Sequence, residues 1–357
     1  ALETAVLCRM LERPKEEVLG KFDRAKRHAV TNGSQKLIMR VAYQYAWTLL
    51  NWYDDYGSFI DEFKELRALM SPDASSREIE NYINLLFLLR GLSSQMEAAP
   101  YHHLIQYQNE KEIAKQVLEG VRNTEGRLCA TLTASIHMEF LNLVDFMNDP
   151  DAVSRTVKRI ESLFEEGEKY IDFPFVSFKD LAMRIGDLLS DNEVYESLID
   201  KLALLSSTRD SELASAEILQ QRGYQKLVAK RFKDSIVYLG RSIVKLAKEE
   251  SKDELVLSLR MLSDAYEHFG LPWASLAAQI AASELLFREW SQNGKVRKRL
   301  VLATRGLSQM ELRIGRIGNF LQWNKLARVL ECHVVQMGPK EEMPYSQLID
   351  GCLSVRI

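Results

Sequence analysis

The feature that most constrains this 357-residue chain is a repeated helix-pair pattern in its second half. Three such units begin near Ser215, Leu255 and Leu300, at spacings of about 40 and 45 residues. In a tandem repeat each unit buries its apolar face against its neighbours, so the repeat specifies an architecture more than a chemistry. The pattern therefore predicts a stack of helices.

Composition favours helices over strands throughout. The chain has 8 prolines, 17 glycines and 46% hydrophobic residues, and it has few of the alternating β-branched runs that build a sheet. Its length exceeds the roughly 250 to 300 residues that one core usually reaches, a limit that a stack avoids by growing in one dimension. We therefore predict an all-α fold, an α-solenoid of antiparallel helix pairs.

Turn residues divide the chain into amphipathic segments with a helical apolar period. Asp149 before Pro150 and Ser71 before Pro72 are expected to cap helix starts. From the sharpness of the pattern we divide the chain into an irregular helical-repeat region, residues 1–205, and clearer repeats, residues 206–357.

The clearest unit combines large, small and turn residues in a fixed order: Leu259, Leu262, Ser263, Tyr266, Gly270, Pro272, Ser275 and Ala282. Here the sequence resembles the tetratricopeptide repeat. The unit before it has Leu219, Gly223, Phe232, Ser235, Leu239 and Ser242 in comparable places, with Arg222 where leucine is expected. The unit after it has Leu307, Ser308, Gly315 and Ile317, with Glu311 replacing the tyrosine and Phe320 replacing a small residue. Spacings longer than the family's roughly 34 residues imply longer helices.

This resemblance implies which residues bind a partner, because in tetratricopeptide proteins the first helix of each pair faces the concave side. The corresponding positions here are Gln220, Tyr224, Arg260, Asp264, His268, Arg305, Gln309 and Arg313. Their mixed donors and acceptors suit a protein surface or peptide carboxylates. They do not reproduce the lysine and asparagine clamp of chaperone-binding members. Simple surface solvation is the alternative for any one of them.

The formal net charge of -3 hides two blocks of opposite sign. Residues 145–200 carry 14 acidic and 6 basic side chains, a balance of -8, whereas residues 291–330 have a balance of +8. Solvated helix faces explain such blocks, but the basic one would also attract an anionic partner. Its charged residues are Lys295, Arg297, Lys298, Arg299, Arg305, Arg313, Arg316, Lys325 and Arg328, against Glu311 alone.

Groups that catalyse reactions or bind metals are few and poorly spaced. The chain has no phosphate-binding glycine loop, and the adjacent His102 and His103 would point to different sides of a helix. Cys332 and His333 diverge in the same way, and no third group can be identified that would orient them. We therefore predict no catalytic residue, no metal and no cofactor.

Four cysteines, Cys8, Cys129, Cys332 and Cys352, are far apart and form no CxxC pair, which favours a reducing cytoplasm. The longest apolar stretch, residues 85–89, is far shorter than the roughly 20 residues that span a bilayer. The first residues lack the pattern of a secretory leader. The chain opens with alanine and stops abruptly at Ile357, as a piece of a longer polypeptide would.

These observations predict a noncatalytic scaffold that binds another protein on its concave face. Its long-helix repeats and charged blocks resemble the sensor arrays of bacterial signal-transduction ATPases with numerous domains, which act in defence against phage. That resemblance implies a separate ATPase and effector. The alternative is a helical repeat that binds nucleic acid through residues 295–328.

Overall fold

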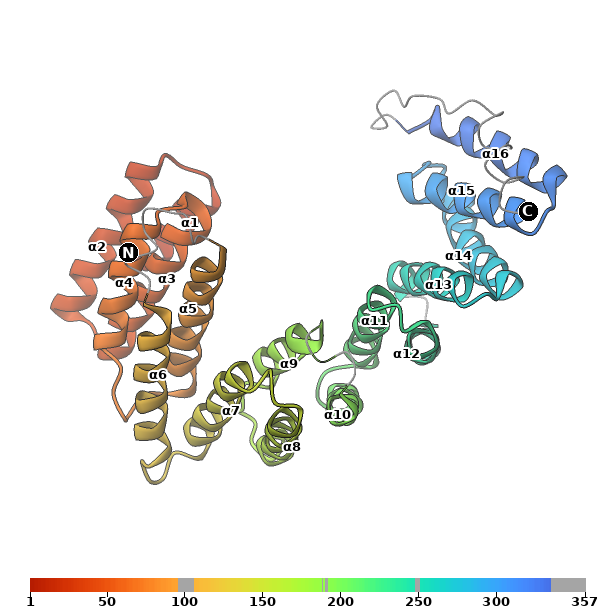
Figure 1. The fold of residues 1–357 in the computed structure, drawn as a ribbon. Helices are drawn as coiled ribbons and strands as arrows, with labels where there is room; N and C mark the ends of the chain where they lie inside the picture. The colour runs from red at the N-terminus through yellow and green to blue at the C-terminus, as the bar shows by residue number, and fades with distance from the viewer. Residues whose placement is uncertain (96–105, 188, 190–191, 248–250, 335–357) are drawn as a thin grey trace. The chain divides into compact units, whose positions relative to one another are not determined.

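The structure, a computed structural model, describes residues 1–95, 106–187, 189, 192–247 and 251–334 (Figure 1). Within these ranges it contains sixteen α-helices and no strand, which confirms the predicted all-α fold. The chain separates into two compact units, residues 1–178 and 179–357. His102, His103 and Cys352 lie outside the described residues.

The first unit is a series of helical hairpins in which α3 pairs with α4, α5 with α6 and α7 with α8. Helix α5 also packs on α3 and α7, so neighbouring hairpins join through their first helices. Its helices are α1 (Leu2–Met10), α2 (Lys15–Asn32), α3 (Gln35–Tyr53), α4 (Tyr56–Ala68), α5 (Ser76–Gln95), α6 (Tyr107–Arg122), α7 (Leu128–Asp145) and α8 (Pro150–Gly167). Helix α9 (Phe175–Arg184) contains the boundary between the units.

The second unit is a solenoid in which α11 pairs with α12, α13 with α14 and α15 with α16, and each hairpin packs on the next. Its elements are the 3₁₀ helix η2 (Ile185–Asp187), α10 (Glu193–Arg209), α11 (Glu212–Val228), α12 (Phe232–Leu246), α13 (Lys252–His268), α14 (Pro272–Asn293), α15 (Lys298–Arg313) and α16 (Ile317–Glu331). The sequence was divided after residue 205 because the repeat pattern is clearer beyond that point. The structural division falls earlier because α10 packs on α11.

The two helices of each hairpin in the second unit approach closely at one repeated point. A serine hydroxyl there donates a hydrogen bond to a carbonyl oxygen of the opposite helix, twelve residues away in the sequence. At the first two crossings the side chains on both helices are small, which lets the backbones come together, whereas at the third the serine faces Phe320. The three bonds are Ser235 Oγ to Gly223 O at 2.8 Å, Ser263 Oγ to Ser275 O at 3.0 Å and Ser308 Oγ to Phe320 O at 3.1 Å.

Helix ends follow local chemistry. Asp149 caps α8 as predicted, because its Oδ1 accepts hydrogen bonds from the amides of residues 151 and 152 at 3.1 Å. Gly270 and Gly315 end α13 and α15 with φ values of +84° and +85°, a conformation that glycine adopts without steric cost. The expected cap at Ser71 is wrong: α5 begins at Ser76, and the Glu78 carboxylate accepts from Ser75 N and Oγ at 2.7 Å.

Aromatic residues around α3 pack mainly into the protein interior. Trp47, Tyr53 and Tyr56 lie against the core of the first unit, whereas Trp52 is 42% exposed. The guanidinium of Arg9, a buried residue, lies 4.9 Å from the ring centres of both tryptophans. These rings therefore enclose a cation of the chain itself.

No helix among the described residues has the length and apolar character needed to cross a bilayer. The described cysteines, Cys8, Cys129 and Cys332, are free thiols.

A buried histidine lies in the apolar interior of the first unit. His137 on α7 is 6% exposed, and neither ring nitrogen has a hydrogen-bond partner among the described residues. Its ring centre lies 4.8 Å from that of Phe178, which stacks on Phe173. Burial lowers the pKa of His137 to about 3, because nothing nearby compensates a positive charge.

This pKa predicts a loss of stability in mild acid. The unfolded chain protonates His137 near its ordinary pKa of 6.5, while the folded chain resists protonation down to about pH 3. Stability that is present above pH 6.5 is therefore lost as the pH falls through this window. Between pH 7 and pH 5 the free energy of unfolding should fall by about 2 kcal/mol more in the wild type than in His137→Leu. Urea denaturation followed by circular dichroism measures this, and parallel pH profiles would contradict it.

Candidate partner-binding face

The first helices of the three repeat hairpins, α11, α13 and α15, are joined directly to one another. Gln220 on α11 donates from Nε2 to the Glu254 carbonyl at 3.0 Å and to Ser258 Oγ at 2.7 Å, both in the α13 segment. Arg313 at the end of α15 forms an ion pair with Glu267 on α13. These contacts place the predicted binding positions on adjacent helices, as the repeat geometry requires.

Three of the eight predicted residues lie around the carboxylate of a fourth. Asp264 on α13 lies near Arg260 and His268, one turn away on either side, and near Arg313 on α15. The Asp264 residue is exposed, but its crowded carboxyl is partly desolvated. Desolvation raises the pKa of this carboxyl above its usual value, and the three neighbouring basic side chains offset that shift only in part.

The remaining predicted residues divide into two kinds. Gln220 is half-buried and bridges helices, and Arg305 forms an ion pair with Glu331 on α16, so both contribute to packing between helices. Tyr224 is 50% exposed and Gln309 is also exposed. Exposed polar side chains of this kind remain available to a partner.

His268 is oriented by the neighbouring hairpin. Its ring lies 5.2 Å from that of Phe232 at an interplanar angle of 24°, and its Nδ1 is 2.8 Å from the Asp264 carbonyl. The stacked ring keeps the histidine beside the carboxylate. The face therefore presents acidic, basic and aromatic groups with part of their geometry already fixed.

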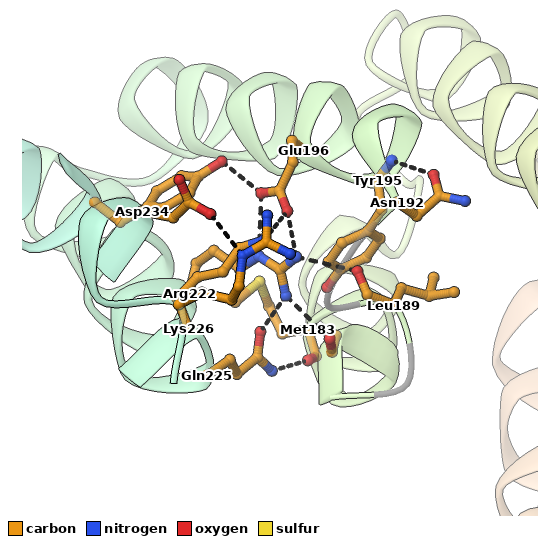
Figure 2. Close-up of polar contacts among 12 residues, drawn as sticks. Met183, Leu189, Asn192, Tyr195, Glu196, Arg222, Gln225, Lys226 and Asp234 are labelled. Atoms are coloured by element: carbon orange, nitrogen blue, oxygen red, sulfur yellow. Dashed lines mark hydrogen bonds and ion pairs between the residues drawn. The ribbon is translucent and has the colours of Figure 1, made fainter. Parts of the chain in front are cut away.

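The residue that departs most from the repeat pattern, Arg222, is fully buried in α11 (Figure 2). It has 0% exposure, and its guanidinium donates to both oxygens of Glu196 on α10, at 2.5 and 3.2 Å. It also donates to the carbonyl oxygens of Gly186 at 3.0 Å and Leu189 at 3.2 Å. The ring of Tyr195 lies 4.6 Å from the guanidinium carbon. The arginine therefore connects α11 to α10 and to the η2 segment.

A second buried cation shares the same carboxylate (Figure 2). Lys226 Nζ lies 2.6 Å from Glu196 Oε1, and Tyr238 on α12 donates its hydroxyl to Glu196 Oε2 at 2.6 Å. Burial alone would raise the pKa of Glu196, but the hydrogen bonds from Arg222, Lys226 and Tyr238 hold it below its usual value. The charged and polar groups of this network are hydrogen-bonded or ion-paired to one another. The network therefore holds α10, α11 and α12 together and does not serve as a binding site.

Glu311, which replaces the tyrosine of the repeat pattern, is likewise buried and held by polar partners. It is 4% exposed and pairs with Arg316 at 3.1 Å, and Asn319 donates to it at 3.2 Å. Both partners follow in the turn and the next helix of the same hairpin. Sequence reasoning noticed Arg222 and Glu311 as mismatches, but the pattern alone did not supply their partners.

The basic segment 291–330 is largely neutralised by acidic residues. Ion pairs within the described residues occupy at least five of its nine basic side chains. They are Arg297 with Glu289 at 2.9 Å, Arg299 with Asp253 at 2.5 Å and Glu289 at 2.9 Å, Arg305 with Glu331, Arg313 with Glu267, and Arg316 with Glu311 at 3.1 Å. A balance of +8 along the sequence is therefore not a continuous cationic surface in space.

In the described part of the chain no three His, Cys, Asp or Glu side chains gather as they would around a metal ion. Cys332 and His333 are exposed at the end of α16, where His333 Nδ1 lies 2.8 Å from the Val329 carbonyl.

No protein-family model and no curated protein matches the chain. Among solved structures it is similar to two of kinesin-light-chain TPR-like repeats from Podosopora anserina, one of them a point variant. The variant has 8% identity and a TM-score of 0.35 over 71% of this chain and 95% of that one. The other has 7% identity and a TM-score of 0.36 over 72% and 99%. A circular tandem repeat protein with a novel repeat topology has 13% identity and a TM-score of 0.30 over 95% and 87%. Likenesses this low transfer neither a partner nor a role to this chain.

The Arg222 network predicts that two carboxylates on α10 differ sharply in their importance. Glu196→Gln removes the negative charge that Arg222 and Lys226 share, and we expect a loss of about 3 kcal/mol or more in the free energy of unfolding. Asp200→Asn, one turn along α10, breaks an exposed 2.7 Å pair with Arg241 and should cost less than about 1 kcal/mol. Urea denaturation compares the two variants. Equal losses of unfolding free energy in the two variants would contradict the conclusion that Arg222 and Glu196 hold α11 against α10.

Proposed function

We propose that this chain is a noncatalytic scaffold that binds another protein on the face formed by α11, α13 and α15. The observation that carries the proposal is the cluster around Asp264, where acidic and basic side chains from two successive first helices come together. A partner that contacts this face meets charges from more than one repeat at once. Such a surface favours specificity, because a wrong partner leaves charged groups unpaired.

A protein partner suits this face better than nucleic acid does. Nucleic-acid binding depends on many cations that are free to neutralise phosphates. Here Arg305 and Arg313 already have carboxylate partners, and Asp264 adds negative charge to the face itself. Alternating charge and an exposed aromatic residue, Tyr224, are typical of protein interfaces.

The finer role is a part of the same proposal. We infer that the scaffold acts in the reducing cytoplasm as the target-sensing array of a larger defence ATPase, with a foreign protein as its target. The support is the resemblance of its long-helix repeats and charged blocks to such arrays. In this role the chain senses and the ATPase and effector act, so binding alone is required of the residues described.

A charge exchange on the face tests the binding role. The double variant Arg260→Glu/Asp264→Arg keeps the net charge of the face and the i, i+4 spacing of the pair. Each of the two positions, however, now presents the opposite charge to the group of the bound protein that it contacts. We expect capture of the bound protein to fall at least tenfold, because matched pairs become repulsive. Quantitative mass spectrometry of proteins retained on the immobilised chain measures this, with circular dichroism confirming unchanged helix content.

The matched control exchanges a pair outside the face. Glu284 and Arg288 on α14 form an exposed i, i+4 ion pair at 2.6 Å, so Glu284→Arg/Arg288→Glu repeats the same manipulation elsewhere. Its captured proteins should equal those of the wild type. The proposed face is wrong if both double variants retain every partner, or if both lose the same ones.

A further inference from the structure

A second candidate interaction surface lies in the first unit and shares no residue with the α11, α13 and α15 face. It is a groove of about 680 Å³ between α1, α2 and α3. Its floor is apolar: Leu2, Ala25, Ala29 and Val41 line it and are buried, and Leu37 at its edge is 38% exposed. Ala25 and Ala29 are one turn apart on α2, so small side chains leave room for another helix to approach.

One wall of the groove is cationic. Lys21, Arg24 and His28 line it from α2 at spacings of three and four residues, which places them along one side of the helix over about 10 Å. Within the described part of the chain neither Lys21 nor Arg24 has an acidic partner. Arg24 Nε lies 3.5 Å from His28 Nε2, a contact between two basic side chains.

The opposite side of the groove does not cancel this charge. Arg40 on α3 lines it and pairs with Glu3 at 2.7 Å, so that acid is already occupied. With Glu3 as the acidic lining residue, Lys21, Arg24 and Arg40 leave the groove with a positive balance. Charge complementarity therefore selects an acidic occupant.

The apolar floor decides between kinds of acidic occupant. A free phosphate or a purely anionic chain would use the cationic wall and would leave Leu37, the exposed apolar residue at the edge of the floor, in contact with water. An amphipathic helix with carboxylates on one side and aliphatic residues on the other would use both. We propose that the groove binds an acidic amphipathic helix of a partner protein, about two to three turns long. This inference does not depend on the function proposed for the other face.

The test uses a fluorescein-labelled helical peptide of about 14 residues, with glutamates on one face and leucines on the other. Its affinity for the full 357-residue chain is measured by fluorescence anisotropy. We expect Arg24→Glu to weaken binding at least tenfold. Arg27→Glu is the matched control, because Arg27 is exposed on the same helix but does not line the groove, and it should change the affinity less than twofold.

Two further arms test the floor and the place of binding. Leu37→Asn, which removes an apolar contact without adding charge, should weaken binding of the amphipathic peptide while leaving the weak binding of a polyglutamate peptide unchanged. Hydrogen exchange should show protection of residues 21–29 and 37–41 when the amphipathic peptide binds.

Three results would overturn the proposal. Equal affinity for polyglutamate would make the groove a simple anion site, and equal effects of the two arginine variants would place binding elsewhere. A wild-type dimer in sedimentation that Arg24→Glu separates would assign the groove to a second copy of the chain.

Discussion

The second unit depends on the close approach of two helices at one point in every hairpin. A buried serine hydroxyl is costly unless it is hydrogen-bonded, and here it reaches a carbonyl of the facing helix at 2.8 to 3.1 Å. At Gly223 an added Cβ would lie 2.7 Å from Leu239 Cγ, so the Leu239 side chain occupies the space that a larger residue at position 223 would need. This contact fixes how each first helix lies against its second helix.

The departures from the pattern show how the stack begins. At the leucine position of the first clear repeat, Arg222 reaches into α10 and η2, whose residues lie 26 to 36 positions earlier. Leucine there would fill space but could not hold the carbonyls of Gly186 and Leu189. We infer that the buried charge is retained because it ties an irregular segment to the regular hairpins. A buried ion pair of this kind contributes specificity more than stability.

Much of the fold could be predicted because its determinants are local. Gly270 ends a helix through its own φ angle, and Ser263 and Ser275 meet across one short turn. The first unit was harder to interpret because it uses bulky contacts, such as Phe22 stacked on Tyr45 at 5.3 Å, where the repeat pattern expects small residues. The candidate face was located by helix position alone. The partners of its side chains, such as Glu331 for Arg305, come from other helices and were not predictable from a local window.

Charge counted along the sequence and charge arranged in space have different consequences for binding. Paired charges on α13 and α15 produce local dipoles, and these are screened within about 8 Å at physiological salt. Such groups act on a partner only at contact, so they determine which partner fits. Lys21 and Arg24, without acidic partners in the described residues, keep a net field that acts before contact and raises the rate of encounter. The largest basic block in the sequence is therefore not the strongest candidate for electrostatic attraction, because most of its arginines are already paired with carboxylates.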